Sequence, residues 1–128
     1  MLSVLIADDS LVMRRMVARS LELSGVPPHE LREACNGAEA LGILREAYVD
    51  IVLCDLHMPV MDGLELVKTL GSDPATADVP VVIVSSERSP GLIAELEDLG
   101  VRGYLRKPFQ PEALGNLVRE VLRLTESA

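Results

Sequence analysis

Three carboxylates, a hydroxyl and an ammonium group stand at the ends of short apolar segments. Asp8 and Asp9 follow one such segment, Asp55 follows another, and Ser85 and Lys107 follow two more. Carboxylates that lie close together repel one another unless a cation joins them, and Mg²⁺ is commonly held by one or two protein carboxylates. A metal, a nucleophilic carboxylate and charge-stabilising groups are the requirements of phosphoryl transfer. The residue types therefore indicate phosphoryl chemistry at one site.

The roles within this set follow from the residue types. Asp55 is the expected nucleophile, since an ionised carboxylate needs no general base. Lys107 would keep Asp55 ionised and neutralise a phosphate, while Ser85 would donate a hydrogen bond to a phosphoryl oxygen. The sequence contains neither a GxxxxGK[ST] motif nor a GxGxxG motif after a strand. We therefore expect a phosphorylated donor rather than a nucleotide held by a P-loop.

Five apolar segments alternate with five amphipathic ones, and this order predicts an α/β fold with a parallel sheet covered by helices on both faces. Three of the apolar segments are nearly uniform, which is typical of strands buried on both faces. The carboxyl ends of parallel strands meet at one edge of the sheet, where the polar residues would converge. The predicted strands are Leu2–Ala7, Leu31–Cys35, Ile51–Cys54, Val79–Val84 and Gly103–Arg106.

Capping signals predict where the helices between these strands begin. Asn36 is a predicted N-cap with Glu39 three residues later, and Ser89 is another, with Pro90 at the first helical position. Asp62 is interpreted as a turn residue or helix cap rather than as a metal ligand. The first helix would be capped in part by the acidic pair that precedes it.

The composition of the chain argues against some classes of function. The 128 residues fit a single domain over 1–128, and the net charge of −8 with only 2% aromatic residues argues against nucleic-acid binding. No apolar run is long enough to insert into a membrane, and no signal peptide is recognised, so the expected location is the cytoplasm. Cys35 and Cys54 are predicted to be reduced and buried.

The motifs resemble those of response-regulator receiver domains. The similarity rests on the acidic pair Asp8 and Asp9, on Asp55 followed by MPVMDG, on Ser85 after VVIV, and on YLRKPF. It covers essentially the whole chain, and DDSLVMRRMV resembles the opening of stand-alone receivers of the chemotaxis (CheY-like) type. The resemblance implies a flavodoxin-like (βα)5 three-layer sandwich with strand order 2-1-3-4-5.

The resemblance also implies how the site would work. A histidine kinase or a histidine phosphotransfer protein would donate phosphate from a phosphohistidine to Asp55. Mg²⁺ would be bound by Asp8, Asp9, Asp55 and the backbone carbonyl of His57. The chain would not be a conventional enzyme, but would promote its own Mg²⁺-dependent phosphorylation and dephosphorylation.

The family pattern further implies a switch. Ser85 and Lys107 would contact the phosphoryl group, and Tyr104 would turn inward when Ser85 moves toward it. The face formed by the fourth helix, fifth strand and fifth helix would then change its affinity for a downstream protein. The Lys107–Pro108 peptide bond matches one that is usually cis in the family.

Several neighbouring residues receive narrower interpretations. His57 and Glu87 flank the predicted site and are expected to influence how readily water reaches an acyl phosphate. Arg14 and Arg15 are interpreted as groups that meet an acidic surface of the kinase, whereas Met16 is assigned to the core.

Three other functions compete with the switch. A phosphorelay carrier, which passes phosphate to a second histidine, would have the same site. A haloacid-dehalogenase-type phosphatase also uses Asp and Mg²⁺, but that family has a second Asp two residues after the nucleophile, where this chain has His57. An unphosphorylated scaffold would not require all five site residues.

Overall fold

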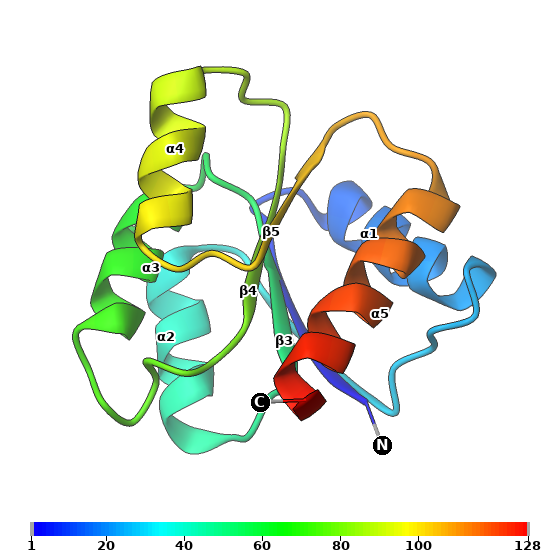
Figure 1. Cartoon of the computed structure of the whole chain (residues 1–128), viewed down its shortest axis with the longest axis horizontal. Helices are drawn as coiled ribbons and strands as arrows, with labels where there is room; N and C mark the ends of the chain where they lie inside the picture. The colour runs from blue at the N-terminus through cyan, green and yellow to red at the C-terminus, as the bar shows by residue number, and fades with distance from the viewer. Residues whose placement is uncertain (1, 128) are drawn as a thin grey trace.

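Five strands and five helices alternate along the chain in a computed structural model that describes residues 2–127, with side chains through 123 (Figure 1). The alternation is the one predicted from the apolar segments. In chain order the elements are β1 (Ser3–Ala7), α1 (Leu11–Leu23), β2 (Glu30–Ala34), α2 (Gly37–Glu46), β3 (Ile51–Cys54), α3 (Gly63–Gly71), β4 (Val81–Ser85), α4 (Pro90–Asp98), β5 (Gly103–Arg106) and α5 (Pro111–Ser127).

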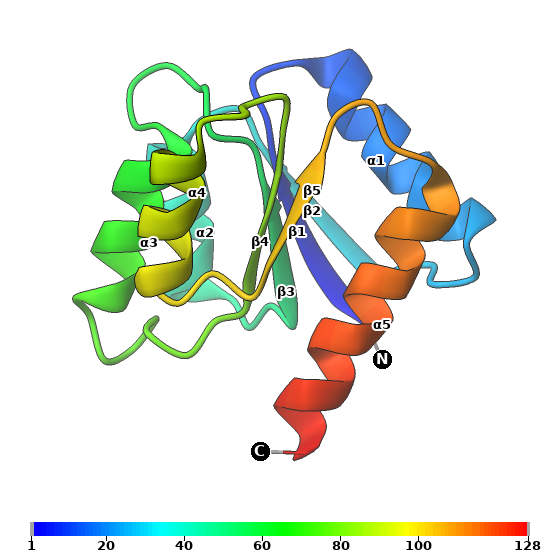
Figure 2. The same ribbon diagram turned by 45° about the horizontal axis from the view of Figure 1, so that its top comes forward.

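The strands form one parallel sheet in the order β2-β1-β3-β4-β5, as predicted. Helices α1 and α5 cover one face, while α2, α3 and α4 cover the other, so the molecule has three layers (Figures 1 and 2). Two hydrophobic clusters fill the spaces between the layers. In β1, for example, Leu5 packs beneath α2 and α3 while Val4 and Ile6 pack beneath α1 and α5. The predicted fold class is confirmed.

Burial follows the position of each strand in the sheet. The three inner strands, β1, β3 and β4, are buried along their whole length, which explains their uniformly apolar sequences. The edge strands β2 and β5 carry exposed or half-buried residues, which explains why their apolar signal is weaker.

Strand boundaries differ by one or two residues from the prediction. The fourth strand begins at Val81 rather than at Val79, because the Val79 N–H belongs to a turn with Thr76 and Pro80 has no N–H to donate. At its other end β4 includes Ser85, which was predicted to follow the strand. The first strand begins at Ser3, and the second covers 30–34 instead of 31–35.

The predicted caps at Asn36, Asp62 and Ser89 are confirmed. Asn36 and Asp62 each accept a backbone N–H at 2.8 Å, and Ser89 accepts one at 3.5 Å. Glu39 departs from the standard capping box, because its carboxylate accepts the N–H of Cys35 rather than that of the cap residue.

Two core predictions are wrong. Met16 is 50% exposed, because the buried stripe of α1 runs through Val17 and Leu21 and leaves Met16 at its side. Cys35 is only partly buried, and its thiol donates to Glu39, which raises the pKa of the thiol. Cys54 is buried as predicted, and burial raises its pKa.

Candidate functional site

Asp8, Asp9 and Asp55 lie together at the carboxyl edge of the sheet. One carboxylate oxygen from each lies within 4.8 Å of the others. Strands β1 and β3 are neighbours, and the Asp55 N–H donates to the Ala7 carbonyl at 2.9 Å, so both strands end at the same level. A compact set of carboxylate oxygens is the donor chemistry that suits Mg²⁺, and these residues therefore fit that ion.

Lys107 joins two of the three carboxylates. Its Nζ lies 2.9 Å from Oδ2 of Asp8 and 3.4 Å from Oδ2 of Asp55. The Lys107 N–H donates to the Ser85 carbonyl at 2.9 Å, which holds the residue beside the end of β4, and the Lys107–Pro108 bond is cis as expected. Asp8 is only 4% exposed, so the ammonium group offsets carboxylate charge that water reaches poorly.

Ser85 and Tyr104 contact the backbone of the same residue, Glu87. The buried Ser85 Oγ accepts the Glu87 N–H at 3.2 Å, and the Tyr104 hydroxyl donates to the Glu87 carbonyl at 2.6 Å. Tyr104 is half-buried, and burial raises the pKa of its phenol. A displacement of Ser85 would therefore reach Tyr104 through the loop between β4 and α4.

The His57 ring is paired with Glu87 at the rim of the site. His57 Nε2 lies 3.0 Å from Oε2 of Glu87, while Oε1 accepts the N–H groups of Arg88 and Ser89. The Ser89 N–H first, and then the His57 ring, hold the pKa of Glu87 below its usual range. The two flanking residues thus form one contact across the loops that follow β3 and β4.

The loop between β3 and α3 folds tightly against Asp55. The Leu56 N–H donates to Asp55 Oδ1 at 2.8 Å, and the Gly63 N–H returns to the Leu56 carbonyl at 2.9 Å. A Cβ at Gly63 would overlap the Asp55 carbonyl oxygen and lie 2.9 Å from the Leu56 Cα. Val60 in the same loop has a φ of 69°, which is rare for a β-branched residue. Asp62 caps α3, so its interpretation as a cap residue is confirmed.

Sequence reasoning missed the contacts of Arg14. Its guanidinium donates to the Asp8 carbonyl at 2.7 Å and to the Glu33 carboxylate at 3.0 Å, and its side chain is 14% exposed. It therefore does not present a free charge to a partner, whereas Arg15 is 70% exposed.

The α1 cap is Ser10, not the acidic pair, because the helix begins one residue later than a cap at Asp9 would require.

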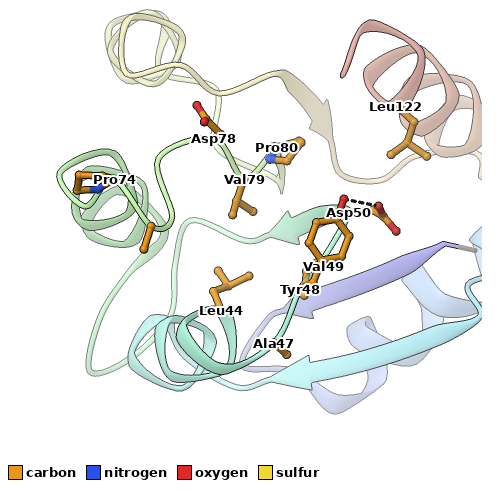
Figure 3. Close-up of a pocket in the computed structure, with 11 residues that line it drawn as sticks. Leu44, Ala47, Tyr48, Val49, Asp50, Pro74, Asp78, Val79, Pro80 and Leu122 are labelled. Carbon is orange, nitrogen blue, oxygen red and sulfur yellow. Dashed lines mark hydrogen bonds between the residues drawn. The ribbon is translucent and has the colours of Figure 1, made fainter. Parts of the chain in front are cut away.

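A hollow of about 410 Å³ lies at the opposite end of β3, away from the carboxylates (Figure 3). Leu44 and Val79 line it, and the Tyr48 hydroxyl donates to Asp50 at 2.9 Å, which raises the pKa of Tyr48. Asp50 also accepts the Ser3 N–H at 2.7 Å, so its carboxylate ties the start of β1 to β3. The contacts of Asp50 with Tyr48 and Ser3 are structural. The predicted phosphoryl chemistry lies at the opposite edge of the sheet, where the carboxylates meet.

Residues 4–119 match the family described as response regulator receiver domain. A chemotaxis protein CheY homolog from Campylobacter jejuni is 33% identical over 122 residues, which cover 94% of this chain and 92% of that protein. The phosphate regulon transcriptional regulatory protein PhoB from Pseudomonas aeruginosa is 31% identical, over 96% of this chain and 52% of its own length.

Solved structures agree with the sequence matches. The chemotaxis protein CheY4 of Vibrio cholerae is 36% identical, with a TM-score of 0.83 over 94% of this chain and 98% of that chain. A CheY-like receiver domain protein from Methanospirillum hungatei shares the fold with a TM-score of 0.87 over 99% and 98% of the two chains, at 23% identity. Among the described residues, no helix has both the length and the apolar character needed to cross a bilayer.

Proposed function

The chain belongs to the response regulator receiver domain family of two-component signalling, and we propose that phosphorylation of Asp55 switches it between two states. We further propose that residues 1–128 form one receiver domain. The main support for phosphorylation at Asp55 is structural. Four side chains lie together at one edge of the sheet, those of Asp8, Asp9, Asp55 and Lys107.

The proposed reaction is transfer of a phosphoryl group from a phosphohistidine. A carboxylate oxygen of Asp55 forms the new O–P bond as the P–N bond breaks, and the imidazole nitrogen leaves with the bonding electrons. Lys107 stabilises charge on the phosphoryl oxygens, and the Ser85 hydroxyl donates to one of them. When bound by Asp8, Asp9, Asp55 and the His57 carbonyl, Mg²⁺ supplies further charge neutralisation. Receiver domains are not conventional enzymes, and we propose that this chain assists its own phosphorylation and dephosphorylation.

The proposed switch passes through Glu87. Movement of Ser85 toward the phosphoryl group would break its contact with the Glu87 N–H, which is 3.2 Å long. The Glu87 carbonyl, held by the Tyr104 hydroxyl, would move with the loop and allow Tyr104 to repack. Phosphorylation would thereby shift the population between two packings of the face formed by α4, β5 and α5.

The proposed partners follow from this scheme. A histidine kinase or a histidine phosphotransfer protein supplies the phosphoryl group, and a downstream protein binds the face formed by α4, β5 and α5. We place the protein in the cytoplasm. Chemotaxis is the first pathway to test, because relatives named as chemotaxis proteins match over nearly their whole length.

Labelling by acetyl phosphate tests the proposal. We expect the native chain to become phosphorylated with Mg²⁺ but not with EDTA, and we expect Asp55→Asn to remain unlabelled. Asp62→Asn is the matched control, because Asp62 is a second acid of the same segment whose carboxylate caps α3. Equal labelling of native protein and Asp55→Asn would contradict the proposal. Transfer of the label to a histidine protein, rather than to water, would identify a phosphorelay carrier.

The His57–Glu87 contact is expected to control the loss of phosphate. Replacing both residues with Ala should speed dephosphorylation several-fold, because we propose that this 3.0 Å pair limits the approach of water to Asp55. The decay of purified phosphoprotein would be followed with time. Replacing both members of the Arg32–Glu30 pair, another ion pair on the protein surface, is the control and should leave the rate unchanged. An unchanged rate in the His57 and Glu87 double variant would contradict the prediction.

A further inference from the structure

We propose that Arg14 is a positioning residue for the metal site, holding the peptide between Asp8 and Asp9 so that both carboxylates face the ion. The inference rests on the proposed Mg²⁺ site. It assigns a task to a side chain that touches neither the metal nor the phosphoryl group.

The guanidinium of Arg14 connects α1 and β2 to the residue that follows β1. It projects from the first turn of α1, donates from Nη1 to the Asp8 carbonyl at 2.7 Å and donates from Nε to Glu33 of β2 at 3.0 Å. The Asp8 N–H in turn donates to the Ala34 carbonyl at 3.0 Å. Both polar groups of the Asp8 backbone are therefore held against β2, one directly and one through Arg14. A guanidinium suits this task because its donors have a fixed planar geometry.

Asp9 depends on this arrangement more than Asp8 does. The Asp8 carboxylate has its own restraints, since Oδ1 accepts the Ser10 N–H at 2.9 Å and Oδ2 accepts from Lys107 at 2.9 Å. Asp9 is exposed, and within the part of the chain that the structure describes its carboxylate makes no hydrogen bond or ion pair. Only the backbone therefore fixes where this side chain starts, and that backbone includes the preceding peptide, whose carbonyl Arg14 binds. Because Mg²⁺ demands near-octahedral geometry, a rotation of that peptide would weaken binding.

The charge of Arg14 alone predicts the opposite effect. A cation near the carboxylates repels Mg²⁺, so a variant that removes only this charge would bind the ion more tightly. On the charge alone, a variant that keeps the positive charge but loses the planar guanidinium would bind Mg²⁺ as the native chain does. A positioning role instead predicts weaker binding in both variants, and the sign of the change separates the two accounts.

The test is calorimetric titration of the unphosphorylated protein with Mg²⁺. We expect Arg14→Lys and Arg14→Gln to lower the affinity about tenfold, the size of effect typical when a group that orients metal ligands is removed. Arg15→Gln is the matched control, because Arg15 is the neighbouring arginine, approaches the same Glu33 at 3.8 Å and is 70% exposed. It should retain native affinity or bind slightly more tightly.

Hydrogen exchange provides a readout that needs no metal. In the metal-free protein, Arg14→Lys should speed exchange of the Asp8 and Ser10 amides relative to Arg15→Lys. The Arg14→Lys variant also keeps the test possible if Arg14→Gln fails to fold. Native Mg²⁺ affinity in Arg14→Lys, or tighter Mg²⁺ binding in Arg14→Gln, would overturn the inference. Variants that lose thermal stability but keep native Mg²⁺ affinity would also overturn it. If the native chain does not bind Mg²⁺, the proposed metal site fails and the inference fails with it.

Discussion

Replacing Gly63 with Ala is expected to lower the free energy of unfolding by about 3 kcal/mol, the upper range for an overpacked site. The new Cβ would overlap the Asp55 carbonyl oxygen and lie 2.9 Å from the Leu56 Cα, and both are backbone atoms. They cannot move aside without shifting the end of β3. Because Asp55 lies at that end, the variant should also be phosphorylated more slowly by acetyl phosphate.

Gly42→Ala is the matched control for this prediction. Gly42 is exposed in the middle of α2, and a Cβ there would meet nothing within 4 Å. The same substitution should therefore raise the free energy of unfolding by roughly 0.5–1 kcal/mol through helix propensity. Denaturant unfolding of both variants checks the pair. Equal stabilities for Gly63→Ala and the native chain would contradict the tight approach of the β3–α3 loop to Asp55.

Lys107→Met is expected to lower the free energy of unfolding by about 3 kcal/mol without Mg²⁺, because removing one partner of a buried ion pair leaves uncompensated charge. The lost ammonium lies 2.9 Å from Asp8 and 3.4 Å from Asp55, and it is 15% exposed. Met preserves much of the aliphatic volume, so packing changes little. The remaining cluster would hold three carboxylates without a cation.

Mg²⁺ should restore much of this stability. An ion that binds the folded state stabilises it by mass action, and the variant has lost the ammonium that competes for Asp8 and Asp55. Thermal unfolding with and without Mg²⁺ should therefore show a larger increase for Lys107→Met than for the native chain. Lys68→Met is the control, since its 3.5 Å pair with Glu95 is exposed and worth only about 0.5 kcal/mol. An equal Mg²⁺ effect in all three proteins would contradict the shared-carboxylate arrangement.

The sequence predicted the parts of the site that depend on strand order. Asp8 and Asp55 each follow a buried strand directly, and Asp9 comes next after Asp8. Parallel strands place such residues at one edge of the sheet. The distances within the cluster confirm that these residues meet there. Their roles in phosphoryl transfer remain predictions. The boundary of β4 was harder to place, because apolar residues continue through the turn that contains Val79.

Contacts that depend on helix packing or on the path of a loop could not be predicted. Arg14 and Glu33 are separated by 19 residues, and their pairing depends on how α1 packs relative to β2. The link from Ser85 through Glu87 to Tyr104 depends on the path of a loop with no periodic pattern. Met16 was misassigned for a related reason, since apolar spacing alone does not show how wide the buried stripe of α1 is.

Mapping the phosphoryl group on the native chain tests the central claim most directly. The protein would be incubated with acetyl phosphate and Mg²⁺, and the modified residue would be identified by mass spectrometry of its peptides after reduction of the acyl phosphate. We expect one phosphoryl group, on Asp55, and none when EDTA is present. A phosphoryl group on Asp8, Asp9 or His57, or no modification under these conditions, would contradict it.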